Sequence, residues 1–96
     1  MSIETRIEEI LSAERIPTAE EMYRMGIEAS TGVDGQEIDL VQAHKWFNLA
    51  ALQGNEEASF YRRQLTEEMD ARQIAAAQRD AREWLRKYRP VVTSAA

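Results

Sequence analysis

One helix of this chain is specified at both of its ends, and it limits the possible fold more than any other segment does. The stretch DLVQAHKWFNLAALQGNEEA occupies residues 39–58. Asp39 is a good helix N-cap, and Gln42 stands three residues later, as in a capping box. Gly54 suits the left-handed conformation that follows a helix, and Asn55 can cap a new one. The segment therefore predicts one helix between these caps and another directly after it.

The first of these two helices carries a narrow apolar stripe. Ala43, Trp46, Phe47 and Ala50 recur at intervals of three and four residues, which places two large rings and two small side chains on one face. We expect both rings to contribute to the core. The small residues, with Gly26 earlier in the chain, should allow the preceding helix to approach closely.

Capping patterns and apolar periodicity extend the prediction to about five helices. Two further capping boxes are predicted, one formed by Thr18 with Glu21 and one by Asp70 with Gln73. The segment TGVDGQEI, residues 31–38, is predicted to be an irregular loop. The helices are predicted over residues 3–14, 18–30, 40–53, 56–68 and 70–88.

The stretch AHKWFNLAALQGNEEA resembles the signature of the Sel-one-like repeat, a helix-pair relative of the tetratricopeptide repeat. In that family a first helix with a small Gly is joined by a Gly-containing loop to a second helix with an Ala, an aromatic pair and a double Ala. The corresponding elements are Met25-Gly26, the loop 32–39, Ala43, Trp46-Phe47 and Ala50-Ala51, closed by Gly54-Asn55 and Ala58.

The resemblance implies an all-α fold, a short α-solenoid built from antiparallel helix pairs. A shift of 37 residues aligns Tyr23 with Phe60, but it aligns Gly26 with Arg63, so the second unit lacks the small residue at the helix contact and looks like a terminal cap. We expect one domain over residues 1–90 and a flexible tail over 91–96; the domain comprises a capping helix (1–17), a full repeat (18–54) and a degenerate terminal repeat (55–90).

Residues for catalysis are missing. The 96 residues include no cysteine, which excludes thiol nucleophiles. They include one histidine, His44, and a single histidine cannot form a His-rich metal site. Paired glutamates lie on helices rich in charge, where solvation explains them better than acid–base chemistry. We therefore expect no enzyme activity, no metal and no cofactor. No run of signal-peptide or membrane-span type interrupts the charged sequence, which predicts a cytoplasmic location and no membrane partner.

Charge is unevenly distributed. Residues 1–39 hold ten acids against three arginines, and residues 40–96 hold seven acids against nine basic residues, so the net charges are −7 and +2 and the halves can attract. The last predicted helix has a basic stripe that could meet an acidic partner or a nucleic acid. The alternative, which we favour, is a solvated face with local ion pairs to Asp80 and Glu83. The stripe consists of Arg72, Arg79, Arg82, Arg86 and Arg89.

The resemblance also implies a function, a non-catalytic protein–protein interaction module that acts as an adaptor or regulatory scaffold. First helices of such pairs line a concave surface that binds a peptide or a helix. Tyr23 and Phe60 are the expected anchors, although either ring could instead fill the core. A small homo-oligomeric subunit, joined through its N-terminal helix or exposed repeat ends, is the alternative. The predicted partner-binding residues are Glu20, Tyr23, Ile27, Ser30, Glu57, Phe60 and Gln64.

Overall fold

The computed structural model describes residues 16–88, and the regular structure within that range is helical. This confirms the all-α prediction. The predicted helix over 3–14 and the tail over 91–96 lie outside the described residues. Among residues 16–88, no helix has the length and apolarity needed to cross a membrane. The elements are α2 (Ala19–Thr31), the 3-10 turn η1 (Val33–Gly35), α3 (Leu40–Leu52), α4 (Glu56–Glu68) and α5 (Ala71–Tyr88).

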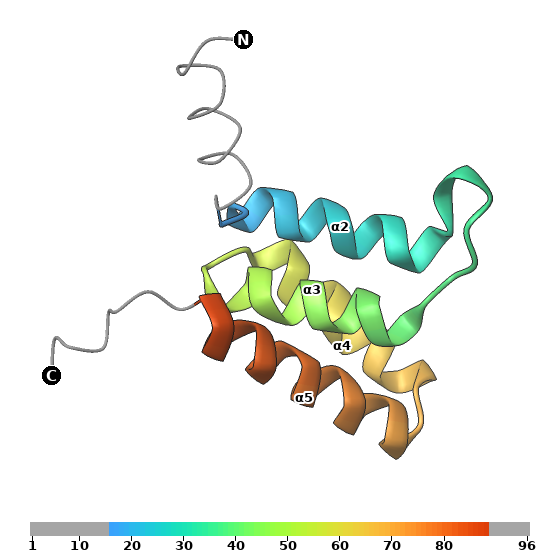
Figure 1. The fold of residues 1–96 in the computed structure, drawn as a ribbon. Helices are drawn as coiled ribbons and strands as arrows, with labels where there is room; N and C mark the ends of the chain where they lie inside the picture. The colour runs from blue at the N-terminus through green and yellow to red at the C-terminus, as the bar shows by residue number, and fades with distance from the viewer. Residues whose placement is uncertain (1–15, 89–96) are drawn as a thin grey trace, which may run out of the picture.

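Helix α3 is the centre of the arrangement. Figure 1 shows α2 antiparallel to α3 on one side, α5 on the other side, and α4 behind α3. The antiparallel pairing of α2 with α3 was predicted from the sequence and is confirmed. Helix α5 packs chiefly against α3 rather than against α4, so the terminal unit does not repeat the packing of the first pair. Arg63 is exposed on α4 where α2 has its small contact residue, which agrees with this difference.

Two of the predicted capping boxes are present in full. At α2 the Glu21 amide donates to Thr18 Oγ1 at 3.1 Å, and the Thr18 amide donates to Glu21 Oε1 at 2.9 Å. At α5 the Gln73 amide donates to Asp70 Oδ1 at 2.8 Å, and the Asp70 amide donates to Gln73 Oε1 at 3.0 Å. Each box satisfies amides that the first helical turn leaves unpaired, which fixes where each helix begins.

The predicted capping box of α3 is half correct. The Gln42 amide donates to Asp39 Oδ1 at 3.0 Å, as expected for an N-cap. The Asp39 amide, however, donates to the backbone carbonyl of Ala29 at 2.9 Å instead of to the Gln42 side chain. This bond joins the start of α3 to the last turns of α2. It closes the loop, in which Gly32 and Asp34 both adopt a positive φ.

The carboxyl end of α3 is a Schellman motif. Gly54 has a φ of 97°, its amide donates to the Ala51 carbonyl at 2.9 Å, and the Asn55 amide donates to the Ala50 carbonyl at 3.1 Å. The Asn55 side chain then accepts from the Ala58 amide at 2.8 Å and caps α4. The predicted stop and restart of the chain at these residues are both confirmed.

The core lies where α2 crosses α3. Phe47 is 1% exposed, and its ring occupies the space in which a Cβ atom on Gly26 would lie, only 2.6 Å from Phe47 Cδ1 and Cε1. Ala43 and Ala50 are fully buried beside it. Trp46 is only half-buried and packs at the edge of the core, so its expected contribution is smaller than that of Phe47.

Adding one methyl group at this contact should destabilise the fold. We expect Gly26→Ala to lower the free energy of unfolding by about 1 to 3 kcal/mol, because the buried Phe47 ring has no room to move. In an exposed helix the same change would stabilise by about 1 kcal/mol. Chemical denaturation followed by circular dichroism measures the difference.

The same substitution in a Phe47→Leu variant tests whether the Phe47 ring causes the loss of stability. In a Phe47→Leu variant the smaller side chain leaves space for the new methyl group, so the added cost of Gly26→Ala should shrink or change sign. An equal loss in both backgrounds would contradict the proposed steric contact.

Candidate functional site

Aromatic side chains form a continuous group across α2, α3 and α4. The rings of Phe47 and Tyr61 stack with centroids 5.7 Å apart, and Tyr23 lies 5.9 Å from Phe47 and 6.1 Å from Tyr61. Phe60 meets Tyr61 edge-on at 5.3 Å. Phe60 is 48% exposed and Tyr61 is 39% exposed. We call Tyr23, Phe60 and Tyr61, the members that reach the surface above Phe47, the aromatic patch.

A carboxylate borders the aromatic patch. Partial removal of water raises the pKa of the Tyr23 hydroxyl, and the nearby Glu57 carboxylate raises it further. A side-chain hydrogen bond with Tyr61 also raises the pKa of Tyr23, so the two hydroxyl groups of the patch interact. Glu57, predicted as a partner contact from its position on the other first helix, is thus brought next to Tyr23 of α2.

The structure sorts the predicted partner residues into two groups. Four are exposed, and three are half-buried. Of these three, Tyr23 and Ile27 pack against the core, and the Ser30 hydroxyl donates to the Ile27 carbonyl at 2.9 Å within its own helix. The exposed group comprises Glu20, Glu57, Phe60 and Gln64.

Sequence reasoning missed the role of Tyr61. The spacing of Tyr61 with Ala58, Leu65 and Met69 is typical of one buried helix face, and those three other residues are indeed buried. Tyr61 instead lies at the margin of that stripe, where its ring contacts Phe47, Tyr23 and Phe60 and stays 39% exposed. Its position next to Phe60 was the only local signal that the two rings form one surface.

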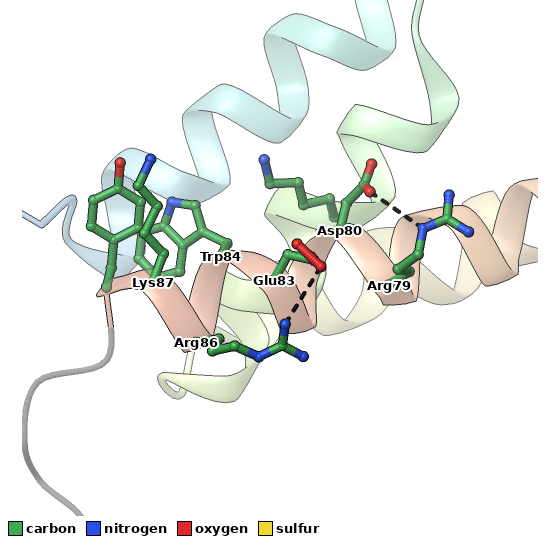
Figure 2. Close-up of a pocket in the computed structure, with 8 residues that line it drawn as sticks. Arg79, Asp80, Glu83, Trp84, Arg86 and Lys87 are labelled. Carbon is green, nitrogen blue, oxygen red and sulfur yellow. Dashed lines mark ion pairs between the residues drawn. The ribbon is translucent and has the colours of Figure 1, made fainter.

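A second site lies on a different face of the molecule, between α3 and α5. It is an open groove of about 660 Å³. Figure 2 shows two ion pairs along α5, Arg79 with Asp80 and Arg86 with Glu83, at 3.9 Å and 3.5 Å. The expected ion pairs of Arg79 with Asp80 and of Arg86 with Glu83 are thus present, whereas the choice between a solvated face and a binding surface stays a prediction. Arg89 lies outside the described residues. We call this the basic groove, lined by Lys45, Arg79, Asp80, Glu83, Trp84, Arg86, Lys87 and Tyr88.

The lysines of the basic groove are bound differently from the arginines. Lys45 Nζ lies over the Trp46 ring at 4.4 Å from its centroid, and Lys87 Nζ lies over the Tyr88 ring at 5.3 Å. Trp84 links the two, since its ring centroid is 6.0 Å from Trp46 and 5.0 Å from Tyr88. This arrangement was not predicted, because Lys45 belongs to α3 and lies outside the basic stripe of α5.

A third feature is an acidic groove of about 460 Å³ between the end of α2, the loop and the start of α3. Its lining includes Trp46, so it adjoins the basic groove across the contact between Trp46 and Trp84. Within the described part of the chain, no lysine or arginine lines it. We call it the acidic groove; its charged members are Glu28, Asp34, Glu37 and Asp39, all of them exposed.

His44 is packed inside the molecule. It is 3% exposed, and its Nε2 atom lies 3.1 Å from Thr66 Oγ1, whose single hydrogen goes to the Arg62 carbonyl at 2.8 Å. Nε2 therefore carries the ring proton and donates to Thr66, while the buried Nδ1 atom has no hydrogen-bond partner among residues 16–88. Burial lowers the pKa of His44 below its ordinary value of 6.5, and the positive charge of Arg62 lowers it further.

Comparison of the chain with family models, curated proteins and solved structures finds no match. The resemblance to the Sel-one-like repeat therefore stays a prediction.

Acid should weaken the fold through His44. A histidine whose pKa is lowered by folding binds fewer protons in the folded chain than in the unfolded one, so stability falls as the pH drops below 6.5 toward the lower folded value. The loss reaches at most about 1.4 kcal/mol per pH unit. In His44→Gln, whose amide can still donate to Thr66, this loss should be absent.

Denaturant titrations at several pH values between about 7.5 and 5 measure the effect. The free energies of unfolding of the two proteins should diverge as the pH falls below the ordinary histidine pKa. All other titrating groups are shared and cancel in the comparison. Parallel stability curves for the two proteins would show that folding does not shift the pKa of His44.

Proposed function

We propose that this chain is a non-catalytic protein-interaction module, an adaptor or scaffold that binds a peptide or helix of another protein through the aromatic patch. The observation that carries the proposal is the pair Phe60 and Tyr61, two adjacent large rings that are 48% and 39% exposed. Tyr61 stacks on the buried Phe47 ring, and Phe60 meets Tyr61 edge-on. Large ordered aromatic side chains at a surface are typical of the residues that dominate binding energy.

The support beneath the patch favours binding. Tyr61 is stacked on Phe47 at 5.7 Å, and Phe60 is held edge-on against Tyr61 at 5.3 Å. A partner that covers these rings would therefore immobilise few additional rotamers, which reduces the entropic cost of association. Aromatic rings also present a large apolar area with few torsions to fix.

The border of the patch suggests the chemistry of the partner. Glu57 lies beside the Tyr23 hydroxyl, and Glu20 and Gln64 are exposed on the same two helices. An apolar side chain flanked by lysine or arginine would place its apolar part on the rings and its charge near the carboxylates. We propose a basic amphipathic segment as the ligand.

The packing of α2, α3 and α4 agrees with the solenoid interpretation, in which α2 and α4 are the first helices of successive units. The small residue of α2 at the contact with Phe47 and the aromatic group shared by α2 and α4 both support it. Under this interpretation the patch lies on the concave side, as the resemblance to the Sel-one-like repeat implies.

Removal of the exposed ring should weaken binding and leave the fold intact. We expect Phe60→Ala to weaken the captured partner's affinity by about tenfold or more, equivalent to about 1.4 kcal/mol, while the melting temperature stays unchanged. Quantitative affinity capture identifies the partner, and titration calorimetry with the purified partner measures the affinity.

The matched control is Ile38→Ala, because Ile38 is an equally apolar residue, 60% exposed, in the loop before α3. It should leave the affinity unchanged. Equal affinities for Phe60→Ala and the parent chain would remove the aromatic patch as the binding site.

A further inference from the structure

We propose that two copies of this chain associate about a two-fold axis through the face that carries both grooves, with the acidic groove of each copy against the basic groove of the other. This face is separate from the aromatic patch, so the proposal is independent of the protein-interaction function. Its two halves have opposite charge, and an aromatic contact joins them.

The charges of the two grooves are complementary. Among residues 16–88 the acidic groove is lined by four carboxylates, of which Asp39 also caps α3, and by no basic side chain. In the basic groove Asp80 and Glu83 are engaged by Arg79 and Arg86, so the remaining positive charge belongs to Lys45 and Lys87. Among residues 16–88 neither lysine forms an ion pair, and each ammonium lies over a ring instead. Both are thus available to an incoming carboxylate.

The aromatic side chains between the grooves supply the apolar part of an interface. Trp46 lines the acidic groove, Trp84 lines the basic groove, and their rings meet edge-on at 6.0 Å. Both indoles are half-buried, and Tyr88 beyond them is 39% exposed. Apolar aromatic residues at the middle of a surface with charged residues around them are typical of protein interfaces.

The arrangement favours a second copy over a nucleic acid. A polyanion that bound Lys45 and Lys87 would pass beside the four carboxylates of the adjoining groove, and the chain as a whole carries a net charge of −5. A second copy turns the same carboxylates into favourable partners.

A two-fold axis follows from the layout of the face. Two-fold symmetry makes each contact between two different patches occur twice, once on each side of the axis. With the contact between Trp46 and Trp84 near the axis, the acidic groove of one copy meets the basic groove of the other, and the reverse pairing forms at the same time. Both complementary contacts are then closed, and growth stops at the dimer.

The full-length chain should therefore dimerise in a salt-dependent manner. Sedimentation equilibrium is expected to give a mass of about twice the 11.0 kDa of the chain. The dissociation constant should rise by about tenfold or more between about 50 and about 500 mM NaCl, because the attraction between the grooves is screened. A monomer at every concentration and salt level would overturn the proposal, and so would open-ended growth beyond a dimer.

Charge reversal locates the interface. A basic-groove variant, Lys45→Glu with Lys87→Glu, and an acidic-groove variant, Glu28→Lys with Glu37→Lys, should each be monomeric, because both contacts of a homodimer become repulsive. An equimolar mixture of the two variants should recover the dimer, since both contacts between unlike copies are attractive again. Failure of the mixture to associate, with both variants folded by circular dichroism, would overturn the arrangement.

Matched controls change the charge elsewhere by the same amount. Arg63→Glu with Arg72→Glu, and Glu67→Lys with Glu68→Lys, alter exposed residues outside both grooves. These variants should dimerise as the parent does, and loss of the dimer in them would show that net charge, not this face, controls association.

A fluorescent single-stranded oligonucleotide tests the competing ligand. The parent chain should not bind it. The proposal would be overturned if the parent chain stayed monomeric and bound the oligonucleotide, and if the basic-groove variant lost that binding. The basic groove would then be assigned to nucleic acid.

Discussion

The close approach of α2 to α3 at Gly26 is the contact on which the rest of the structure depends. A hydrogen atom in place of a side chain lets the Phe47 ring occupy the surface of α2, with 2.6 Å between the ring and the position of a Cβ atom. That ring then supports Tyr23 from one helix and Tyr61 from another. The surface aromatic rings thus depend on the space that Gly26 leaves in the interior, because the Phe47 ring that fills this space holds Tyr23 and Tyr61 in place.

Helix α3 separates two surfaces through adjacent residues. Successive side chains on a helix point about 100° apart, so Phe47 faces α2 and α4 while Trp46 faces α5 and the grooves. The two proposed activities use these different faces. Because one rigid helix carries both rings, binding at the aromatic patch and association through the grooves can occur on the same molecule.

The tertiary structure also converts an uneven charge distribution into local complementarity. The excess of acids in residues 1–39 and of basic residues in 40–96 says nothing about where the charges meet. Packing places the acids near the end of α2 and the basic residues of α5 in two separate grooves on either side of the contact between Trp46 and Trp84. Pairing of Arg79 and Arg86 with their own helix neighbours then leaves Lys45 and Lys87 as the cations of the basic groove that form no ion pair among residues 16–88.

The sequence by itself determined the helices and their ends. Helix α4 has the predicted bounds, and the caps at Thr18, Asn55 and Asp70 form the predicted bonds. These features depend on groups three to five residues apart, so local spacing is sufficient to predict them. The apolar stripe of α3 likewise identified Phe47 as a core residue, because periodicity reveals which face is buried.

Only the tertiary structure decided how distant groups meet. The Asp39 amide bonds to Ala29, Tyr61 stays half in solvent, and Lys45 joins residues of α5 in one groove. Each outcome depends on the angle and register at which helices pack. A shift of one helix along its neighbour by one turn would replace each of these contacts. Those quantities arise from the close packing of side chains from several helices, which no single segment of the sequence specifies.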